Sequence, residues 1–178
     1  MKKYFQAFFR PVLLLTVLLF TVSLSGCGYR VGSLAHPQLR TVAIADVKNE
    51  TYEVLVATLL RNILAERFQF DNSLKLVSME KADCVVYARV LSVNNSSISY
   101  RNFNKVEDYR PNDYRLTIRV EFTVLMPGKP TPLVRKRFAV GSSLYNFTHD
   151  PAIGRENALR QCVLRVANTI VSSTTEAW

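Results

Sequence analysis

The segment from Asp113 to Met126 alternates between apolar and polar side chains along its length. Successive side chains of a β-strand point to opposite faces of the sheet, so the alternation predicts a strand with one apolar and one solvated face. The apolar side chains are Tyr114, Leu116, Ile118, Val120, Phe122, Val124 and Met126. Such a strand must pack its apolar face on another layer and leave its other face in water.

Two segments predict the amphipathic helices of that second layer. Between Tyr52 and Phe68, apolar residues at positions 55, 56, 59, 60, 63, 64 and 68 have helical spacing, and Asn49 or Thr51 is the candidate N-cap. A second helix is expected near Asp150 as N-cap, with apolar residues at positions 159, 162, 163, 166, 167, 170 and 171. Gly154 costs about 1 kcal/mol relative to alanine, which leaves a later start open.

Further strands are predicted at residues 41–47, 74–78, 84–93 and 133–145. Residues 94–97 predict a bulge or bend, residues 101–112 a polar hairpin loop, and residues 127–130 a turn. The expected order is strand, helix, four strands, helix. It predicts an α+β fold, a two-layer sandwich with two helices on one face of a four- to five-stranded mixed, mostly antiparallel sheet.

The first 26 residues have the pattern of a secretory signal peptide. Lys2 and Lys3 supply the positive end, and the mostly apolar run from Val12 to Leu24 is shorter than the roughly 20 residues that a membrane-spanning helix needs. Leu24-Ser25-Gly26-Cys27 matches the bacterial lipobox, in which small residues fit the signal peptidase and the cysteine thiol receives diacylglycerol. The alternative is an ordinary signal peptide followed by a chance cysteine.

The domain organisation follows from this processing site. We expect a lipoprotein signal peptide at residues 1–26, lipidated Cys27 and a tether at 27–40, a single α/β domain at 41–174, and a short tail at 175–178. An aspartate after the cysteine retains lipoproteins at the inner membrane of enteric-type bacteria. Gly28 therefore favours the outer membrane, where acyl chains such as palmitate would anchor the protein on the periplasmic side.

The sequence contains no recognisable catalytic or cofactor motif. Its two histidines, His36 and His149, have no metal-ligand spacing, and no nucleophile elbow, P-loop or dinucleotide-binding fingerprint occurs. We therefore expect neither enzymatic activity nor a cofactor nor a metal. Cys84 and Cys162 lie in apolar runs, so they are two buried free thiols or a disulfide allowed by an oxidising compartment, and we favour free thiols.

Basic residues predict an anionic partner. The chain has a net charge of +9, and removal of the signal peptide leaves 20 basic and 14 acidic residues, a net charge of +6. One cluster comprises Lys129, Arg135, Lys136 and Arg137, and another lies around Arg101, Lys105, Arg110 and Arg115. Adjacent hairpins of one sheet could bring the clusters to the same end or face, where Arg and Lys suit phosphate oxygens. The alternative is a solvated strand face that opposes aggregation.

Lys136 is the basic residue to test first. It shares its parity with Val134, Phe138 and Val140, so an unbulged strand would direct it to the apolar side, where a lone ammonium is costly. Either a bulge turns it outward, the strand begins after it, or its charge is used at a rim. Nucleic acid is set aside as a partner because a lipoprotein outside the cytoplasm seldom meets it.

Four features resemble the lipopolysaccharide-assembly lipoproteins of the outer membrane, the LptE type. Gly26-Cys27-Gly28-Tyr29 is similar to the family's opening segment, and the element order agrees over residues 27–172. Asp113-Tyr114 with the strand that follows and Thr123 to Gly128 resembles its sheet hairpin, and Pro132 to Phe138 resembles the basic strand after the turn.

The resemblance implies two partners. Family members sit as a plug inside the outer-membrane β-barrel that transports lipopolysaccharide, and they help to assemble that barrel. They also bind lipopolysaccharide, which implies a role for Lys136, Arg135, Arg137, Arg101, Lys105 and Lys129 in binding the lipid A phosphates. The C-terminal tail is shorter than in some relatives, which puts any role of the tail in doubt.

A rival interpretation is an envelope lipoprotein that recruits other proteins without binding lipopolysaccharide. The segment from Thr41 to Thr51 also resembles the strand-to-helix opening of curli-secretion-type lipoproteins, which have a similar α/β unit. The hairpin around Pro127-Gly128 and the basic strand favour lipopolysaccharide assembly. A small-ligand-binding module is a third interpretation, and it would need a deep apolar pocket.

Overall fold

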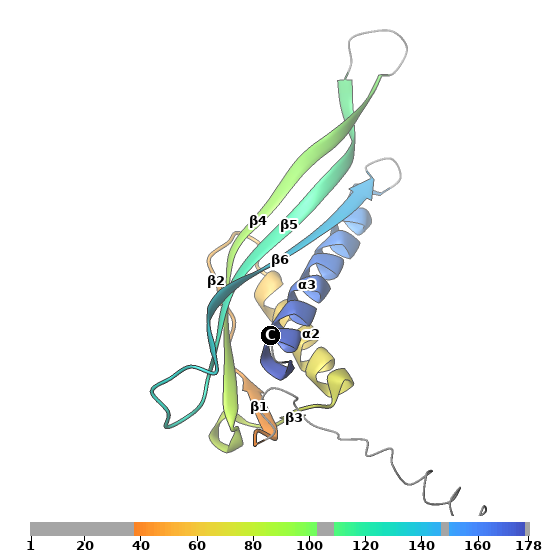
Figure 1. The fold of residues 1–178 in the computed structure, drawn as a ribbon. Helices are drawn as coiled ribbons and strands as arrows, with labels where there is room; N and C mark the ends of the chain where they lie inside the picture. The colour runs from red at the N-terminus through yellow and green to blue at the C-terminus, as the bar shows by residue number, and fades with distance from the viewer. Residues whose placement is uncertain (1–37, 103–108, 147–149, 177–178) are drawn as a thin grey trace, which may run out of the picture. The chain divides into compact units, whose positions relative to one another are not determined.

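The computed structural model describes residues 38–102, 109–146 and 150–176 (Figure 1). Its elements, in chain order, are β1 (Thr41–Ile44), β2 (Lys48–Asn49), α2 (Val56–Asp71), β3 (Lys75–Leu76), the 3-10 turn η2 (Met79–Lys81), β4 (Cys84–Asn102), β5 (Tyr109–Leu125), β6 (Val134–Asn146) and α3 (Pro151–Thr175). The predicted signal peptide, Cys27, and both histidines lie outside the described residues.

The strands form one mixed sheet in the order β3-β1-β4-β5-β6, with β2 alongside β4. The short strands β1, β2 and β3 pair in parallel, whereas β4, β5 and β6 form long antiparallel pairs. Both helices pack on the same face of this sheet. The predicted α+β sandwich is confirmed, and the two-residue β2 brings the sheet to six strands.

β5 forms the centre of the core, as its alternation predicts. Its inward side chains from Leu116 to Val124 are at most 2% exposed. Every apolar position predicted for the second helix is buried in α3. In α2 the buried residues are Val56, Leu60, Ile63, Leu64 and Phe68.

The start of α3 agrees with the prediction from the sequence, and the start of α2 differs from it. Asp150 caps α3, since its Oδ1 accepts hydrogen bonds from the amides of Ala152 and Ile153 at 3.0 and 3.2 Å, and Gly154 does not delay the start. The predicted caps of α2 are wrong. Asn49 Oδ1 instead accepts from Thr51, which holds the preceding loop, so α2 begins later.

The later start of α2 also places Leu55 outside the helix. This residue was expected on the buried stripe, but it precedes the helix as an uncapped boundary residue and is 73% exposed.

The ribbon of β4 and β5 is longer than predicted. β4 continues through the polar residues 94–97 to Asn102, and β5 begins at Tyr109, so residues 101–102 and 109–112 of the expected loop are strand. Residues 94–97, where a bulge or bend was predicted, pair with β5 in regular register, and the register shifts lie on either side, between Val90 and Ser92 and between Ser97 and Tyr100. Pairing with a long partner strand outweighs the weak strand preference of Asn and Ser.

Gly141 allows α3 to approach β6 closely. A Cβ atom built on Gly141 would lie 2.1 Å from the carbonyl oxygen of Cys162. The Cys162 thiol lies 3.2 Å from the carbonyl oxygen of Leu116, so this part of α3 contacts two neighbouring strands. The backbone of β6 itself therefore forms part of the helix-packing surface.

We predict that Gly141→Ala lowers the free energy of unfolding by about 1–3 kcal/mol, because the added methyl group overpacks this contact. Urea unfolding followed by circular dichroism measures the change. Ser142→Ala is the matched control, because Ser142 is the next residue of β6 and points to the face of the sheet away from α3. It should change stability by less than about 0.5 kcal/mol. Equal stability of Gly141→Ala and the parent chain would contradict the packing argument.

Candidate functional site

A β-bulge at the start of β6 sets the position of Lys136. Phe122 pairs with Arg137 and Val124 pairs with Val134, so β6 has one residue more than β5 in this interval. The extra residue reverses the parity of β6, with Val134 buried before the bulge and Ala139 buried after it. Of the three alternatives for Lys136, the outward turn at a bulge is the one observed.

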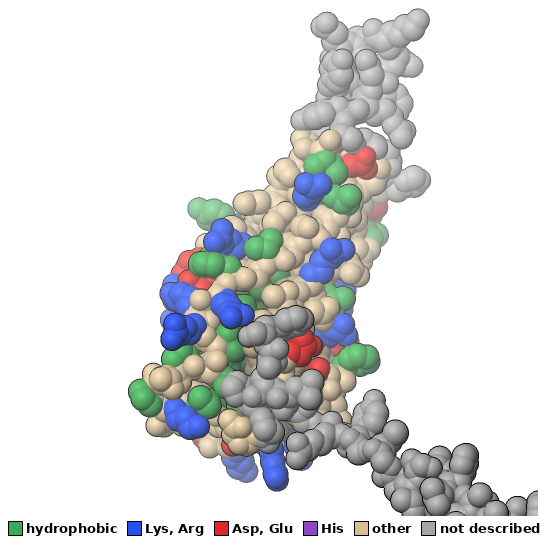
Figure 2. All heavy atoms as spheres, in the orientation of Figure 1, with side chains coloured by type: hydrophobic (Ala, Val, Ile, Leu, Met, Phe, Trp, Pro, Cys, Tyr) green, Lys and Arg blue, Asp and Glu red, His purple; other side chains and the backbone are tan. Residues whose placement is uncertain are grey.

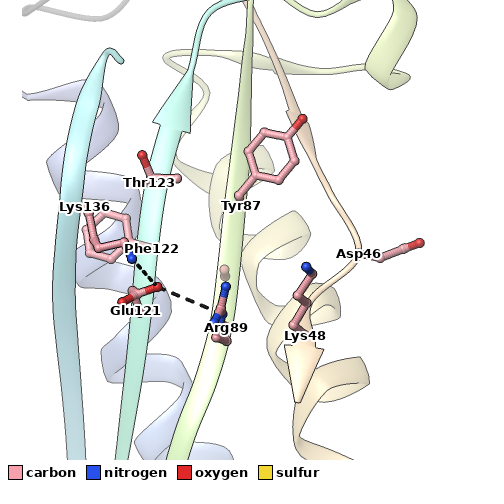
Figure 3. Close-up of a pocket in the computed structure, with 9 residues that line it drawn as sticks. Asp46, Lys48, Tyr87, Arg89, Glu121, Phe122, Thr123 and Lys136 are labelled. Atoms are coloured by element: carbon pink, nitrogen blue, oxygen red, sulfur yellow. Dashed lines mark ion pairs between the residues drawn. The ribbon is translucent and has the colours of Figure 1, made fainter. Parts of the chain in front are cut away.

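Lys136 forms an ion pair on the outward face of the sheet. Its Nζ atom lies 3.2 Å from Oε1 of Glu121, and the same oxygen lies 4.0 Å from Nε of Arg89 (Figure 3). Nη1 of Arg89 also donates to Glu50 at 3.0 Å. Glu121 is directly opposite Arg89 in the β4–β5 register, and its side chain is 16% exposed, so one carboxylate holds two cations in place.

A hollow of about 260 Å³ lies over these residues. Lys48, Arg89 and Lys136 provide cationic side chains to it, while Tyr87 provides an aromatic ring (Figure 3). Asp46 also borders the hollow, but its carboxylate pairs with Arg61 at 3.0 Å. No described acidic residue forms an ion pair with Lys48. An Arg fork and two ammonium groups around a hollow suit an anion with several oxygens, such as a phosphate.

The other predicted basic residues divide between two ends of the sheet. Arg135 and Arg137 are exposed beside Lys136, and Lys129 lies in the nearby turn after β5. Arg101 pairs with Arg110 near the other end of β5, and Lys105 is outside the described residues. β5 spans Tyr109–Leu125, which corresponds to about 50 Å, so the hairpins place the two clusters at opposite ends of the sheet (Figure 1).

Three members of the site were not predicted, namely Lys48, Arg89 and Glu121. Arg89 had a usable signal, because it is the single charged residue within the apolar run from Cys84 to Val93. Glu121 was assigned only to the solvated face of β5. Lys48 depends on β2, whose parallel pairing with β4 places it opposite Arg89.

The two cysteines are free, buried and far apart. Cys84 is adjacent to Val85, which pairs with Leu125, whereas the Cys162 thiol contacts the carbonyl of Leu116. Nine residues of β5 separate these points, or about 30 Å, which no disulfide can span. Burial raises the pKa of Cys84 to about 11 and also raises the pKa of Cys162, so neither thiol is a reactive nucleophile near neutral pH.

Within residues 38–102, 109–146 and 150–176, no helix is long and apolar enough to cross a membrane. The same part of the chain contains no cluster of three His, Cys, Asp or Glu side chains suited to a metal ion.

A family model for lipopolysaccharide assembly, LptE, matches residues 39–174. No curated protein sequence is significantly similar to the chain.

Several solved structures resemble the fold. A Xanthomonas campestris protein has a TM-score of 0.58 at 11% identity and aligns over 82% of this chain and 90% of its own. A PelC variant from Paraburkholderia phytofirmans, a dodecamer, has a TM-score of 0.50 at 11% identity, over 84% and 96%. The rare lipoprotein B from Shewanella oneidensis has a TM-score of 0.41 at 18% identity, over 74% and 92%. At such identities the first two likenesses show the fold alone.

We predict that Glu121→Gln strengthens anion binding at the hollow, because it removes the negative charge that Lys136 and Arg89 share. An exposed ion pair is worth up to about 1 kcal/mol, so the affinity for pyrophosphate should rise by up to about fivefold. Titration calorimetry at low ionic strength measures this. Glu156→Gln, on the exposed face of α3, makes the same charge change and should leave the affinity nearly unchanged. Equal gains in both variants would indicate a general charge effect and no localised site.

Proposed function

Since the chain belongs to the LptE family of lipopolysaccharide-assembly proteins, we propose that it is an outer-membrane lipoprotein that plugs and helps to assemble the lipopolysaccharide-transport β-barrel. We further propose that it binds lipopolysaccharide through Lys136 and Arg89. The arrangement that supports this binding best is the outward bulge of β6, which brings Lys136 beside Arg89 over one hollow. A binding role of this kind requires no catalytic group.

The proposed anchor is the set of acyl chains on Cys27. The lipobox Leu24-Ser25-Gly26-Cys27 supports lipidation, and Gly28 supports sorting to the outer membrane. Each buried methylene of an acyl chain contributes about 0.8 kcal/mol, so several chains together hold a protein firmly where a single chain does not. The domain from Thr41 onward would then face the periplasm.

The proposed lipopolysaccharide contact is electrostatic at its centre. The lipid A phosphates are multivalent anions, and Arg89 can offer a fork of donors while Lys48 and Lys136 offer point charges. Arg135 and Lys129 extend the positive surface near the hollow, whereas Arg137 is opposite the inward residue Phe122 and so belongs to the helix side of the sheet. Arg101 belongs to the distant end of the β4–β5 pair, so it would contact a different part of the same ligand or another partner, and the proposed role of Lys105 concerns a residue outside the described part of the chain.

The proposed barrel contact draws on the cationic residues of the sheet's outward face. Membrane barrels have polar interiors, and some are filled by a plug. Figure 2 shows Lys and Arg side chains over the visible face, with few Asp and Glu side chains among them. A barrel wall with exposed acidic residues would complement this surface.

The alternative function, a protein adaptor that does not bind lipopolysaccharide, is favoured by one feature. In the loop before α2, Tyr52 is fully exposed and Val54 and Leu55 are 82% and 73% exposed. A protein partner that covers these side chains would remove apolar surface from water. The binding experiment below separates the two functions.

We predict that Lys136→Ala with Arg89→Ala weakens binding of the full chain to lipopolysaccharide at least tenfold, since each charge-assisted hydrogen bond contributes about 1.5–3 kcal/mol. Surface plasmon resonance on immobilised lipopolysaccharide measures the affinity. Arg160→Ala with Arg165→Ala, on the exposed side of α3, removes the same charge and should have little effect. Equal losses in the two double variants, or no loss in either, would refute the site.

We predict that the tagged full chain copurifies with a large β-barrel from detergent-solubilised outer membranes, because a plug is retained by contacts on all sides. Mass spectrometry identifies the bound protein. Cys27→Ser should abolish labelling by a palmitate analogue and reduce recovery of the complex. Recovery of soluble or inner-membrane partners alone would rule out the barrel.

A further inference from the structure

β6 is an edge strand of the sheet. β6 is the last strand in the sheet order, and no strand in the described parts of the chain pairs with its other side. The backbone amides and carbonyls along such an edge are a template for an additional strand.

The two halves of this edge differ in chemistry. The first half has the bulge and three consecutive cations, Arg135, Lys136 and Arg137, and both features oppose unspecific strand pairing. The second half, from Phe138 to Tyr145, contains no charged residue, no proline and no bulge. The second half of the edge therefore lacks the charges, prolines and bulges that commonly prevent unspecific strand pairing.

Apolar side chains lie along this unprotected half. After the bulge, Phe138, Val140 and Leu144 point to the outward face, and they are 50%, 56% and 58% exposed. An extended segment on β6 would place every second side chain against this row. The bulge that turns Lys136 outward also turns these apolar residues outward.

A second open edge provides an internal comparison. Beyond β2, β4 has no described neighbour on its free side, and its outward residues there are Ser92, Asn94 and Ser96. Its large exposed apolar residue, Ile98, lies at a register shift. The two edges therefore differ, and of the two the β6 edge combines unpaired backbone with three exposed apolar side chains in one row, which Ser142 interrupts.

Charge identifies the kind of strand that fits. Arg119 on β5 lies opposite Val140 and has its guanidinium 4.3 Å from the centroid of the Phe138 ring, and Arg115 lies opposite Leu144. With Arg135 in the bulge at the end of the row, these cations outnumber Glu121, the carboxylate opposite Phe138. They complement acidic side chains, whereas a second copy of this chain, with a net charge of +6 after removal of the predicted signal peptide, would be repelled.

We propose that Phe138–Tyr145 of β6 accepts an extended, acidic segment of a partner protein as an additional strand of the sheet. Alternate apolar side chains of that segment contact Phe138, Val140 and Leu144, and its acidic residues lie toward Arg115 and Arg119. The partner's backbone supplies the affinity, and the apolar row sets the register. This surface does not depend on lipopolysaccharide binding, so it stands or falls separately from the proposed function.

The test uses the full ¹⁵N-labelled chain in detergent and a capped probe peptide of about eight residues, with alternating valine and threonine and two glutamates at one end. We expect saturable shifts and slowed hydrogen exchange of the amides from Phe138 to Tyr145. A peptide with methyl groups on alternate backbone nitrogens should not bind, because it cannot pair with an edge. Replacement of the glutamates by lysines should weaken binding.

Matched variants separate strand addition from general adhesion. Val140→Ser with Leu144→Ser should weaken the peptide about tenfold or more, since two apolar contacts are lost. Ile98→Ser, on the other open edge, should leave the affinity unchanged. An unaltered amide spectrum away from β6 verifies that each variant is folded.

Several outcomes would overturn the proposal. They are absence of peptide binding, equal binding of the methylated peptide, and shifts that centre on β4 or the helices. Self-association that protects the same amides without peptide would assign the edge to a second copy. Protection by phosphatidylglycerol vesicles together with no response to peptide would assign it to a lipid surface.

Discussion

β5 packs its inward row, from Leu116 to Val124, into the core beneath α3, and this packing determines where the remaining side chains lie. Because side chains alternate along a strand, burial of that row places Arg119 and Glu121 on the opposite face. The strands on both sides of β5 are held in register with it, so their outward residues form rows across the sheet. Arg89, Glu121 and Phe138 make up one such row. The candidate site is thus a consequence of how the core is packed.

The bulge in β6 resolves a conflict between this core and the sequence. Without it, Lys136 and Phe138 would share the buried face with Val134, and a lone ammonium would have to leave water. One inserted residue keeps Val134 and Ala139 in the core and transfers Lys136 to the outward face, where it forms an ion pair with Glu121. The same insertion exposes Phe138 and Val140, so a cationic site and an apolar edge arise from a single local change. Gly141 completes the arrangement, because the shifted parity directs it toward α3, where only a residue without a side chain fits.

The sequence predicts the features that depend on local periodicity. The strand centred on Ile118, the apolar stripe of α3 and its cap at Asp150 all follow from the spacing of residues close in the chain. Features that depend on residues distant in the chain could not be predicted from local sequence patterns. The extension of β4 to Asn102 depends on pairing with β5, and the later start of α2 depends on a loop held by Asn49.

The candidate site shows the same division. Lys136 could be singled out from the sequence, because an unbulged strand would direct its charged side chain to the apolar face. A bulge was one of the alternatives that would avoid this. Arg89 and Lys48 reach the hollow through two different pairings of β4, one antiparallel and one parallel, which no local pattern encodes. Glu121 has the further effect of holding Lys136 and Arg89 in place while reducing their net charge, so the cations stay oriented without a ligand. An anion that binds there must displace or share this carboxylate, which favours ligands with several charged oxygens over a single monovalent ion.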